Sequence, residues 1–377
     1  MKAIVNTTLV MPDHFVPDGA VVIDGDRIAA VGPRKDLDLG GIETVDAGGL
    51  YAGPGLIEMH THADGDHFFY EEPEKAAATL LSHGVTSTLT ALYFNQTKDA
   101  LLDQMKLIKR AMKTAKNIIG FYMEAPYLNP KFGCDRENNP WKGPVDPKDY
   151  LPLIEEAGDL AKVWCVAPER ENIKEFVLAA KIKNPLAVFS VAHSEATPQE
   201  VEALIPLGLR LATHHTNATG TLHKYPECRG VCVDEAVWAN PEIYAELICD
   251  KIGIHVDPYM LRLVRRIKGD DRVILISDSF VEHGPVPPGY DGADDINFDF
   301  AGEIAGTRII LDMACRNIIN HTGASLCQAF KFASTNPARL LSLDDRGSLE
   351  VGKKADILLV DHVFNVRSVF KDGEPVK

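Results

Sequence analysis

Histidines and carboxylates recur in this sequence directly after short apolar runs, where they could share a metal ion. His60 and His62 follow the segment GLIEM and are two residues apart. In an extended strand, residues two apart point to the same side, so both imidazoles can reach one cation. The pair alone is also compatible with two surface or core histidines, so its interpretation depends on further ligands elsewhere in the chain.

Four more such residues follow apolar runs. Glu124 ends IIGFYM, His193 ends AVFSVA, His214 ends LRLAT and Asp278 ends VILIS. Each of them alone is compatible with a capping or hydrogen-bonded side chain at the end of a strand. If all these runs are parallel strands of one closed barrel, however, every one of these side chains reaches the same rim. The set therefore predicts one shared site.

The residue types in this set suit hydrolysis assisted by a metal ion. Three or more neutral imidazoles with a carboxylate bind Zn²⁺, Fe²⁺ or Mn²⁺, and such an ion lowers the pKa of bound water toward ~7. A carboxylate after a wholly apolar strand is costly to bury without a partner, which favours a cation or a proton-transfer role for Asp278. We expect Asp278 to accept the proton of water and to pass it to a leaving nitrogen. The sequence thus predicts a metal-dependent hydrolase with one or two ions per chain, Zn²⁺ being favoured over Fe²⁺ or Mn²⁺.

The middle of the chain alternates apolar runs with helix-like segments, as βα units do. Eight strands over about 290 residues fit a TIM-like (β/α)₈ barrel, and a doubly wound sheet is the alternative. Residues 284–299, rich in Gly, Pro and Asp, are expected to form a long loop. The expected strands are 56–59, 87–92, 118–123, 163–166, 187–192, 211–213, 243–248 and 273–276, and helices are expected at 98–113, 198–207 and 258–267.

The two ends of the chain share a β-rich texture. Short strand-like runs surround Asp-Gly turns at Asp24–Gly25 near the start and at Asp372–Gly373 near the end. Neither end can bury an apolar face alone, so we expect both to pair in one small β-sandwich domain. The predicted division is a small domain from residues 1–52 and 347–377, with the barrel at 53–346.

Composition limits the classes of partner. The chain of 377 residues has a formal net charge of −15, which disfavours nucleic acid and anionic membranes as partners. A small phosphorylated substrate needs only two or three local donors and stays possible. The seven cysteines show no CxxC spacing, and neither a signal peptide nor an apolar run of ~18 residues is apparent. A cytoplasmic protein is therefore expected.

Several segments resemble the amidohydrolase superfamily and, within it, the N-acetylglucosamine-6-phosphate deacetylases. The resemblance runs from AGPGLIEMHTHADGD through MEAPYLNP, VAHSEAT, ATHHTNAT and ELICDKIGIHVDP to the C-terminal STNPARLLSLDDRGSLEVGKKADILLVD. It implies a barrel that deacetylates an N-acetyl amino sugar 6-phosphate, acting as a homodimer. The reading of the residues leaves open an N-acyl-amino-acid deacylase, a cyclic-amide hydrolase or a non-catalytic homologue.

The resemblance also assigns roles. Glu124, His193 and His214 would hold the main metal, while His60 and His62 would permit a second ion bridged by Glu124. Asp278 matches the general acid and base, and His255 matches the histidine that contacts the substrate and polarises the acetamide carbonyl. Asn217 and Ala218 match a segment that contacts the sugar.

The chain departs from the family in four places, one of them the sixth-strand signature, which reads His-His-Thr-Asn-Ala-Thr where the family commonly has His-x-x-Asn-Ala-Met. The sequence reads Tyr122-Met123-Glu124-Ala125 where the family usually has His before and Gly after the metal-binding Glu. It reads Phe132-Gly133-Cys134-Asp135 instead of Lys-Gly-Ala-His. Residues 225–230 replace an Arg-Glu-Pro-Gly phosphate-binding segment, which leaves Arg229 as the candidate phosphate ligand. The departures leave the metal and proton-transfer residues in place and put the substrate in question.

Overall fold

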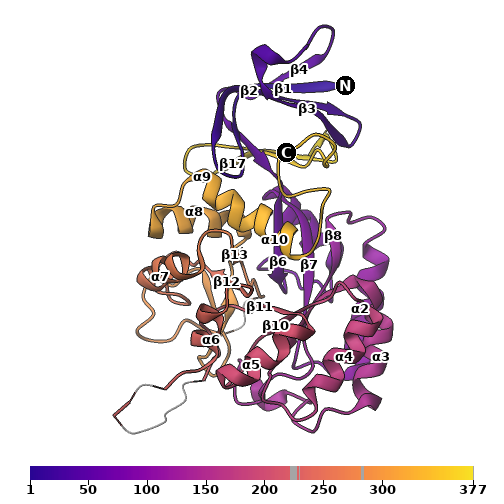
Figure 1. The fold of residues 1–377 in the computed structure, drawn as a ribbon, viewed down its shortest axis with the longest axis vertical. Coiled ribbons are helices and arrows are strands. Elements are labelled where there is room, and N and C mark those ends of the chain that lie inside the picture. Colours follow the sequence, from indigo (N-terminus) through magenta and orange to yellow (C-terminus); the bar gives the residue numbers. More distant parts are fainter. Residues whose placement is uncertain (221–226, 229, 282–283, 377) are drawn as a thin grey trace.

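The protein is built from a barrel and a smaller sheet at one end of it (Figure 1). The structure, a computed structural model, describes residues 1–220, 227–228, 230–281 and 284–376. No helix within these ranges is long and apolar enough to cross a membrane. Arg229 lies outside the described residues, so its predicted role is not addressed by the structure.

Eight parallel strands form the barrel, in the order in which they follow along the chain. Parallel neighbours require a crossover, and a helix supplies each one. The eight expected strands and the barrel are confirmed, with ends that differ by a few residues. The strands are β6 (Leu56–Thr61), β7 (Val85–Tyr93), β8 (Ile118–Glu124), β9 (Ala161–Val166), β10 (Val188–Val191), β11 (Leu209–Ala212), β12 (Tyr244–Ile248) and β13 (Val273–Ile276).

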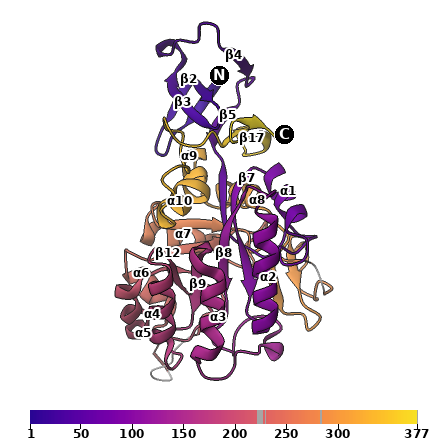
Figure 2. The ribbon, with the colours of Figure 1, turned by 90° about the vertical axis from the view of Figure 1, so that its right-hand side faces the viewer.

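One helix follows each barrel strand and covers it from outside. Figure 2 shows α2, α3 and α4 lying along the outer side of β8 and β9. The three expected helices are confirmed, although α5 ends at Leu204 and continues as a 3-10 turn, Ile205–Leu207. The helices are α1 (Pro73–Ser82), α2 (Lys98–Ala111), α3 (Pro147–Ala157), α4 (Ile173–Lys183), α5 (Pro198–Leu204), α6 (Val233–Ala239), α7 (Pro258–Lys268) and α8 (Leu311–Thr322).

The first and last barrel strands meet where the site residues lie. The amide of Asp278 donates to the carbonyl of His60 at 3.0 Å, and the amide of His62 donates to the carbonyl of Ser279 at 3.0 Å. Beneath this seam the carboxylate of Glu58 accepts the amides of His60 and Ser277 at 3.0 and 3.1 Å. Burial raises the pKa of Glu58 to about 8, because the lost hydration outweighs the hydrogen bonds from Ser277 and His60. The seam fixes the ends of β6 and β13 against each other.

Both ends of the chain form one small sheet, as expected. β16 pairs antiparallel with β5 on one side and with β17 on the other, which joins the C-terminal strands to the N-terminal ones. Ile4 and Val5 alternate between two apolar clusters, so the expected sandwich is made by one sheet that buries both faces. The strands are β1 (Lys2–Val10), β2 (Phe15–Asp24), β3 (Arg27–Pro33), β4 (Glu43–Asp46), β5 (Tyr51–Pro54), β16 (Ile357–Val360), β17 (Val366–Lys371) and β18 (Glu374–Pro375).

The small sheet stands at the amino ends of the barrel strands. β6 begins two residues after β5 ends, so the carboxyl ends of the barrel strands point away from the sheet (Figure 1). Short helices close this end of the barrel before the chain returns to the sheet, namely α9 (Leu326–Phe330) and α10 (Asn336–Leu340), joined by a π-helical turn, Lys331–Thr335. The rim that carries the site is therefore free to hold substrate-binding loops.

The expected loop at 284–299 is wrong at its end. Residues Ile296–Phe298 form β14, which pairs antiparallel with β15 (Ile304–Thr307). The Gly, Pro and Asp residues around this strand led to the prediction of a loop. All three residues of the strand are nevertheless buried, because they pack beneath the preceding loop. The hairpin matters for function because the amide of Thr307 donates to the carbonyl of Asp278 at 2.9 Å.

Candidate metal centre and active site

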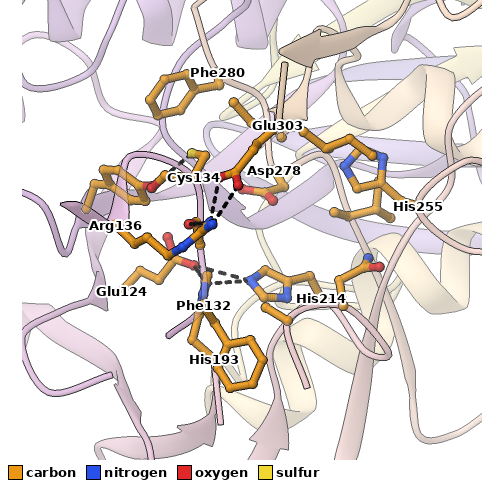
Figure 3. A pocket seen from close by; sticks show the side chains of 18 of the residues that line it. Glu124, Phe132, Cys134, Arg136, His193, His214, His255, Asp278, Phe280 and Glu303 are labelled. Carbon is orange, nitrogen blue, oxygen red and sulfur yellow. Dashed lines mark hydrogen bonds and ion pairs between the residues drawn. The ribbon is translucent and has the colours of Figure 1, made fainter. Parts of the chain in front are cut away.

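Glu124 stands at the meeting point of the four predicted histidine ligands. Its Oε1 lies 2.8 Å from His193 Nε2 and 3.3 Å from His214 Nε2. Its Oε2 lies 3.1 Å from His62 Nε2 and 3.7 Å from His60 Nε2. These side chains come from the ends of four different barrel strands, and Figure 3 shows Glu124, His193 and His214 converging at the base of a pocket. The carboxylate thus faces two separate pairs of imidazoles.

The first group of possible metal ligands is Glu124, His193 and His214. One ligand atom of each lies within 4.8 Å of the others, and all three residues are buried. The two Nε2 atoms of His193 and His214 are 3.1 Å apart and both point at the same carboxylate oxygen. Two imidazole nitrogens and a carboxylate oxygen form the donor set that Zn²⁺, Fe²⁺ and Mn²⁺ accept.

The second group is His60, His62 and Asp278, whose ligand atoms also lie within 4.8 Å of one another. Asp278 Oδ1 is 3.5 Å from His60 Nε2 and 3.4 Å from His62 Nε2. In the part of the chain that the structure describes, the buried Nε2 of His60 has no hydrogen-bond partner. A buried nitrogen that faces carboxylates without a hydrogen bond fits a metal ligand, so the residues present suit a cation in this group as well.

The two carboxylates of the site are held ionised. Burial acts to raise the pKa of Glu124, but hydrogen bonds from His193, His214, His60 and His62 outweigh it and hold that pKa well below its usual range. Burial likewise opposes ionisation of Asp278, and the charges of His60 and His62 overcome it, so the pKa of Asp278 is also lowered. Two buried negative charges among imidazoles give the site a strong attraction for a divalent cation.

Three site residues adopt a left-handed backbone conformation that non-glycine residues rarely take. The φ angles are 43° at His193, 30° at His214 and 46° at Asp278. Such conformations cost on the order of 1 kcal/mol each and persist where the surrounding structure fixes them. The amide of Asn129 bonds to the carbonyl of His193 at 2.9 Å, and Thr307 bonds to that of Asp278. The turns direct these side chains into the mouth of the barrel.

Gly306 sets how closely β15 approaches the carboxylate Asp278. Its φ is +70°, and a Cβ there would lie 2.4 Å from the carbonyl oxygen of Asp278. We predict that Gly306→Ala lowers kcat by about 100-fold, because a shift of about 1 Å at a catalytic group has that effect. Steady-state kinetics would measure it. Gly292→Ala is the control, since Gly292 has a φ of +84° with nothing within 4 Å. Equal losses in both variants would contradict the prediction.

A cavity of about 430 Å³ opens above the metal-binding groups. His255, Asn217 and Ala218, predicted to contact the substrate, all line it. Asp250 accepts the backbone amide of His255 at 2.9 Å and lies 3.4 Å from its Nδ1, which orients the ring. Although burial acts to raise the pKa of Asp250, the bonds from His255 and neighbouring amides lower it to about 2. The buried Nδ2 of Asn217 has no hydrogen-bond partner among the described residues and could donate to a ligand.

The cavity has lining residues that the sequence did not single out. The guanidinium of Arg136 donates to Glu303 through two bonds of 2.5 and 2.7 Å, and Figure 3 shows the two side chains pointing toward each other. The hydroxyl of Tyr93 donates to the carbonyl of Cys134 at 2.7 Å. Cys134 belongs to a segment that departs from the family, and Arg136 directly follows that segment, which was the available signal. Glu303 lies 167 positions from Arg136, so no local pattern pairs them.

A (β/α)₈ barrel with histidine and carboxylate groups at the carboxyl ends of its strands defines a class of metal-binding hydrolases. A family model described as "Amidohydrolase family" matches residues 51–376, and the chain belongs to this family. It is thus a hydrolytic enzyme that acts on an amide bond. A shorter match, to an imidazolonepropionase-like composite domain of bacteria, covers residues 19–38.

Several relatives span nearly the whole chain, and the resemblance to deacetylases is confirmed. An N-acetylglucosamine-6-phosphate deacetylase of Haemophilus influenzae is 26% identical, covering 99% of this chain and 98% of its own length. That of Bacillus subtilis is 25% identical, with 93% and 91% covered. The solved deacetylase of Pasteurella multocida has a TM-score of 0.84 at 25% identity, covering 99% of both chains. That of Mycobacterium smegmatis, solved in complex with N-acetyl-D-glucosamine-6-phosphate, has a TM-score of 0.84 at 24% identity, covering 100% and 99%.

Proposed function

We propose that the enzyme removes the acetyl group of an N-acetyl amino sugar 6-phosphate, with N-acetylglucosamine-6-phosphate as the first candidate. Water is consumed, and acetate and the amino sugar phosphate are released. The observation that carries the proposal is the placement of Asp278 beside the histidine groups at the base of a cavity that His255 also lines. Relatives of this name that span nearly the whole chain support the choice of substrate.

Each residue of the site has a part in this reaction. Glu124, His193 and His214 would hold a divalent ion, for which we propose Zn²⁺ with Fe²⁺ and Mn²⁺ as alternatives. Such an ion polarises a carbonyl and makes water nucleophilic at neutral pH. Asp278 accepts the proton of the attacking water and transfers it to the nitrogen of the breaking amide bond. His255 donates a hydrogen bond to the acetamide oxygen, where negative charge develops.

Acetate release with a panel of sugars would test the proposal. The metal-replete enzyme is given N-acetylglucosamine-6-phosphate, N-acetylgalactosamine-6-phosphate and the two unphosphorylated sugars. We expect a phosphorylated sugar to show the highest kcat/KM. Turnover restricted to N-acyl amino acids or cyclic amides would establish one of the other amidohydrolase activities instead. Protein that takes up no metal and hydrolyses none of these compounds would be a non-catalytic homologue.

The phosphate requires a cation that is not already paired. Among the described residues that line the cavity, the cations are Lys131 and Arg136, and each is bound to a carboxylate, Glu195 and Glu303 respectively. We therefore keep Arg229, which lies outside the described residues, as the proposed phosphate ligand.

Arg229→Ala should raise the KM for the phosphorylated sugar by about 10- to 100-fold and leave that of the unphosphorylated sugar unchanged. A hydrogen bond to a charged group contributes about 1.5–3 kcal/mol, which corresponds to this range. Initial rates over a range of concentrations measure both constants. The control is the double variant Arg136→Gln/Glu303→Gln, which removes the ion pair without changing net charge. If only the double variant discriminates between the two sugars, Arg136 is the phosphate ligand.

We also propose a homodimer and a cytoplasmic location. The resemblance to the deacetylases supports the first. The second is supported by seven cysteines that are all free, most of them buried. Light scattering of the eluting protein during gel filtration would give the mass, and a monomeric mass would reject the dimer.

A further inference from the structure

Behind the second metal-binding group lies a buried carboxylate without an assigned role. Glu246 is on β12 and is 0% exposed. Its Oε2 lies 3.4 Å from His60 Nδ1, on the side of the ring opposite Nε2, which faces Glu124 and Asp278. The same oxygen accepts the hydroxyl of Tyr122 at 3.0 Å and lies 3.3 Å from the amide of His214. Three donors from three barrel strands and their ends therefore converge on one carboxylate oxygen.

Tyr122 fixes the same histidine from its face. The rings of Tyr122 and His60 are stacked, with centroids 4.2 Å apart and planes inclined by 18°. The Tyr122 hydroxyl also lies 2.8 Å from Thr213 Oγ1, which keeps the tyrosine ring in place. The His60 ring is thus held in two ways: the Tyr122 ring stacks on its face, and the Glu246 carboxylate lies beside its Nδ1. Its Nε2 is left facing Glu124 and Asp278 without a hydrogen bond.

The orientation also determines which nitrogen carries the proton. A carboxylate beside Nδ1 stabilises the proton there, and the lone pair then lies on Nε2, where a metal ion can take it. The other oxygen of Glu246, Oε1, is buried, and no residue within the described ranges forms a hydrogen bond with it. All three donors therefore lie at Oε2, and burying a carboxylate with its second oxygen unpaired is costly. A nearby divalent cation would offset that cost.

We propose that Glu246 and Tyr122 are positioning residues that hold His60 as a ligand of a second metal ion, in the group of His60, His62 and Asp278. The inference rests on the metal centre of the proposed function and is independent of which amide is hydrolysed. It predicts two ions per chain, with the second one dependent on residues that touch neither ion. Neither residue was identified from the sequence as part of the site.

Metal titration without substrate tests the proposal. Chelator-treated full-length protein is titrated with Zn²⁺ by calorimetry, and bound metal is counted by mass spectrometry after desalting. We expect two ions in the parent protein. In Glu246→Gln, whose amide can donate to Nδ1 and so reverse the tautomer, the second ion should bind about 10- to 100-fold more weakly. The first ion, held by Glu124, His193 and His214, should bind as in the parent.

Two further variants keep the test decisive. Tyr122→Phe retains the stacked ring and removes only the bond to Glu246, so it should weaken the second ion less than Glu246→Gln does. If Glu246→Gln fails to fold, the affinity of Tyr122→Phe for the second ion tests the proposal instead. Ser190→Ala is the control, because Ser190 belongs to the same buried network through Thr213, at 2.6 Å, and does not contact His60. It should bind both ions as the parent does.

The other outcomes overturn the inference. A parent protein that saturates with one ion has no second metal site. If Glu246→Gln binds both Zn²⁺ ions as tightly as the parent protein does, Glu246 is not a positioning residue. If the variant loses affinity for both ions equally, Glu246 has a general structural role. These results are distinct from a failure of the proposed function, since a one-metal enzyme that deacetylates the sugar would contradict only the inference. A two-metal protein inactive on every sugar would contradict only the proposed substrate.

Discussion

Asp278→Asn is expected to lower kcat by about 10²- to 10⁴-fold, the range typical for loss of a general acid and base. Asp278 is the carboxylate of the second group and lines the cavity, and its pKa is lowered although burial acts to raise it, because His60 and His62 lie close by. It is therefore ionised and able to accept a proton, which an asparagine amide cannot do. Steady-state rates of acetate release would measure the change.

Two controls separate proton transfer from general damage in this variant. Glu124, His193 and His214 are untouched, so the ion of the first group should be retained in Asp278→Asn. Asp356→Asn removes another buried carboxylate, which pairs with Lys371 in the small sheet, and should leave kcat near that of the parent. Near-normal turnover in Asp278→Asn would mean that a different residue moves the proton.

Glu124→Gln should abolish tight metal binding and lower activity to that of metal-stripped protein, a loss of about 10³-fold or more. Its two oxygens face all four histidines of the two groups, so one substitution removes a predicted ligand of the first group and the negative charge that faces the second. A glutamine amide would also direct a donor at imidazole nitrogens that need to bind a cation. Metal content after desalting and acetate release, both compared with chelator-treated parent, would measure these effects. Full metal content with normal activity would exclude Glu124 as a ligand.

The sequence was sufficient for the barrel and for the residues at its rim. Glu124, His193, His214 and Asp278 each follow an apolar run, and parallel strands in a barrel bring their carboxyl ends to one place. Proximity could therefore be predicted without knowing any distance. Their roles in metal binding and catalysis stay predictions.

The residues inside the barrel could not be predicted in the same way. Tyr122 and Glu246 sit within apolar strands, and their contact depends on how β8 and β12 tilt across the interior, which no local pattern encodes. The sequence signals were a carboxylate inside the run AELIC, which a buried strand does not usually contain, and Tyr122 in a segment that departs from the family. The pairing of Arg136 with Glu303 likewise depends on loop paths. Strand β14 was missed because turn-forming residues surround its short apolar run.

The arrangement of the small sheet has a consequence for synthesis of the chain. β5 lies between β1 and β16, and β16 begins only at Ile357, after the whole barrel. At about 5–20 residues per second, translation leaves that edge of β5 without its partner for on the order of tens of seconds. An unpaired strand edge is a template for aggregation, so a ribosome that stops within the barrel releases a product with this edge exposed. Completion of the sheet thus requires synthesis of the whole barrel, and products truncated within the barrel should be recognisable to proteases and chaperones by their open edge.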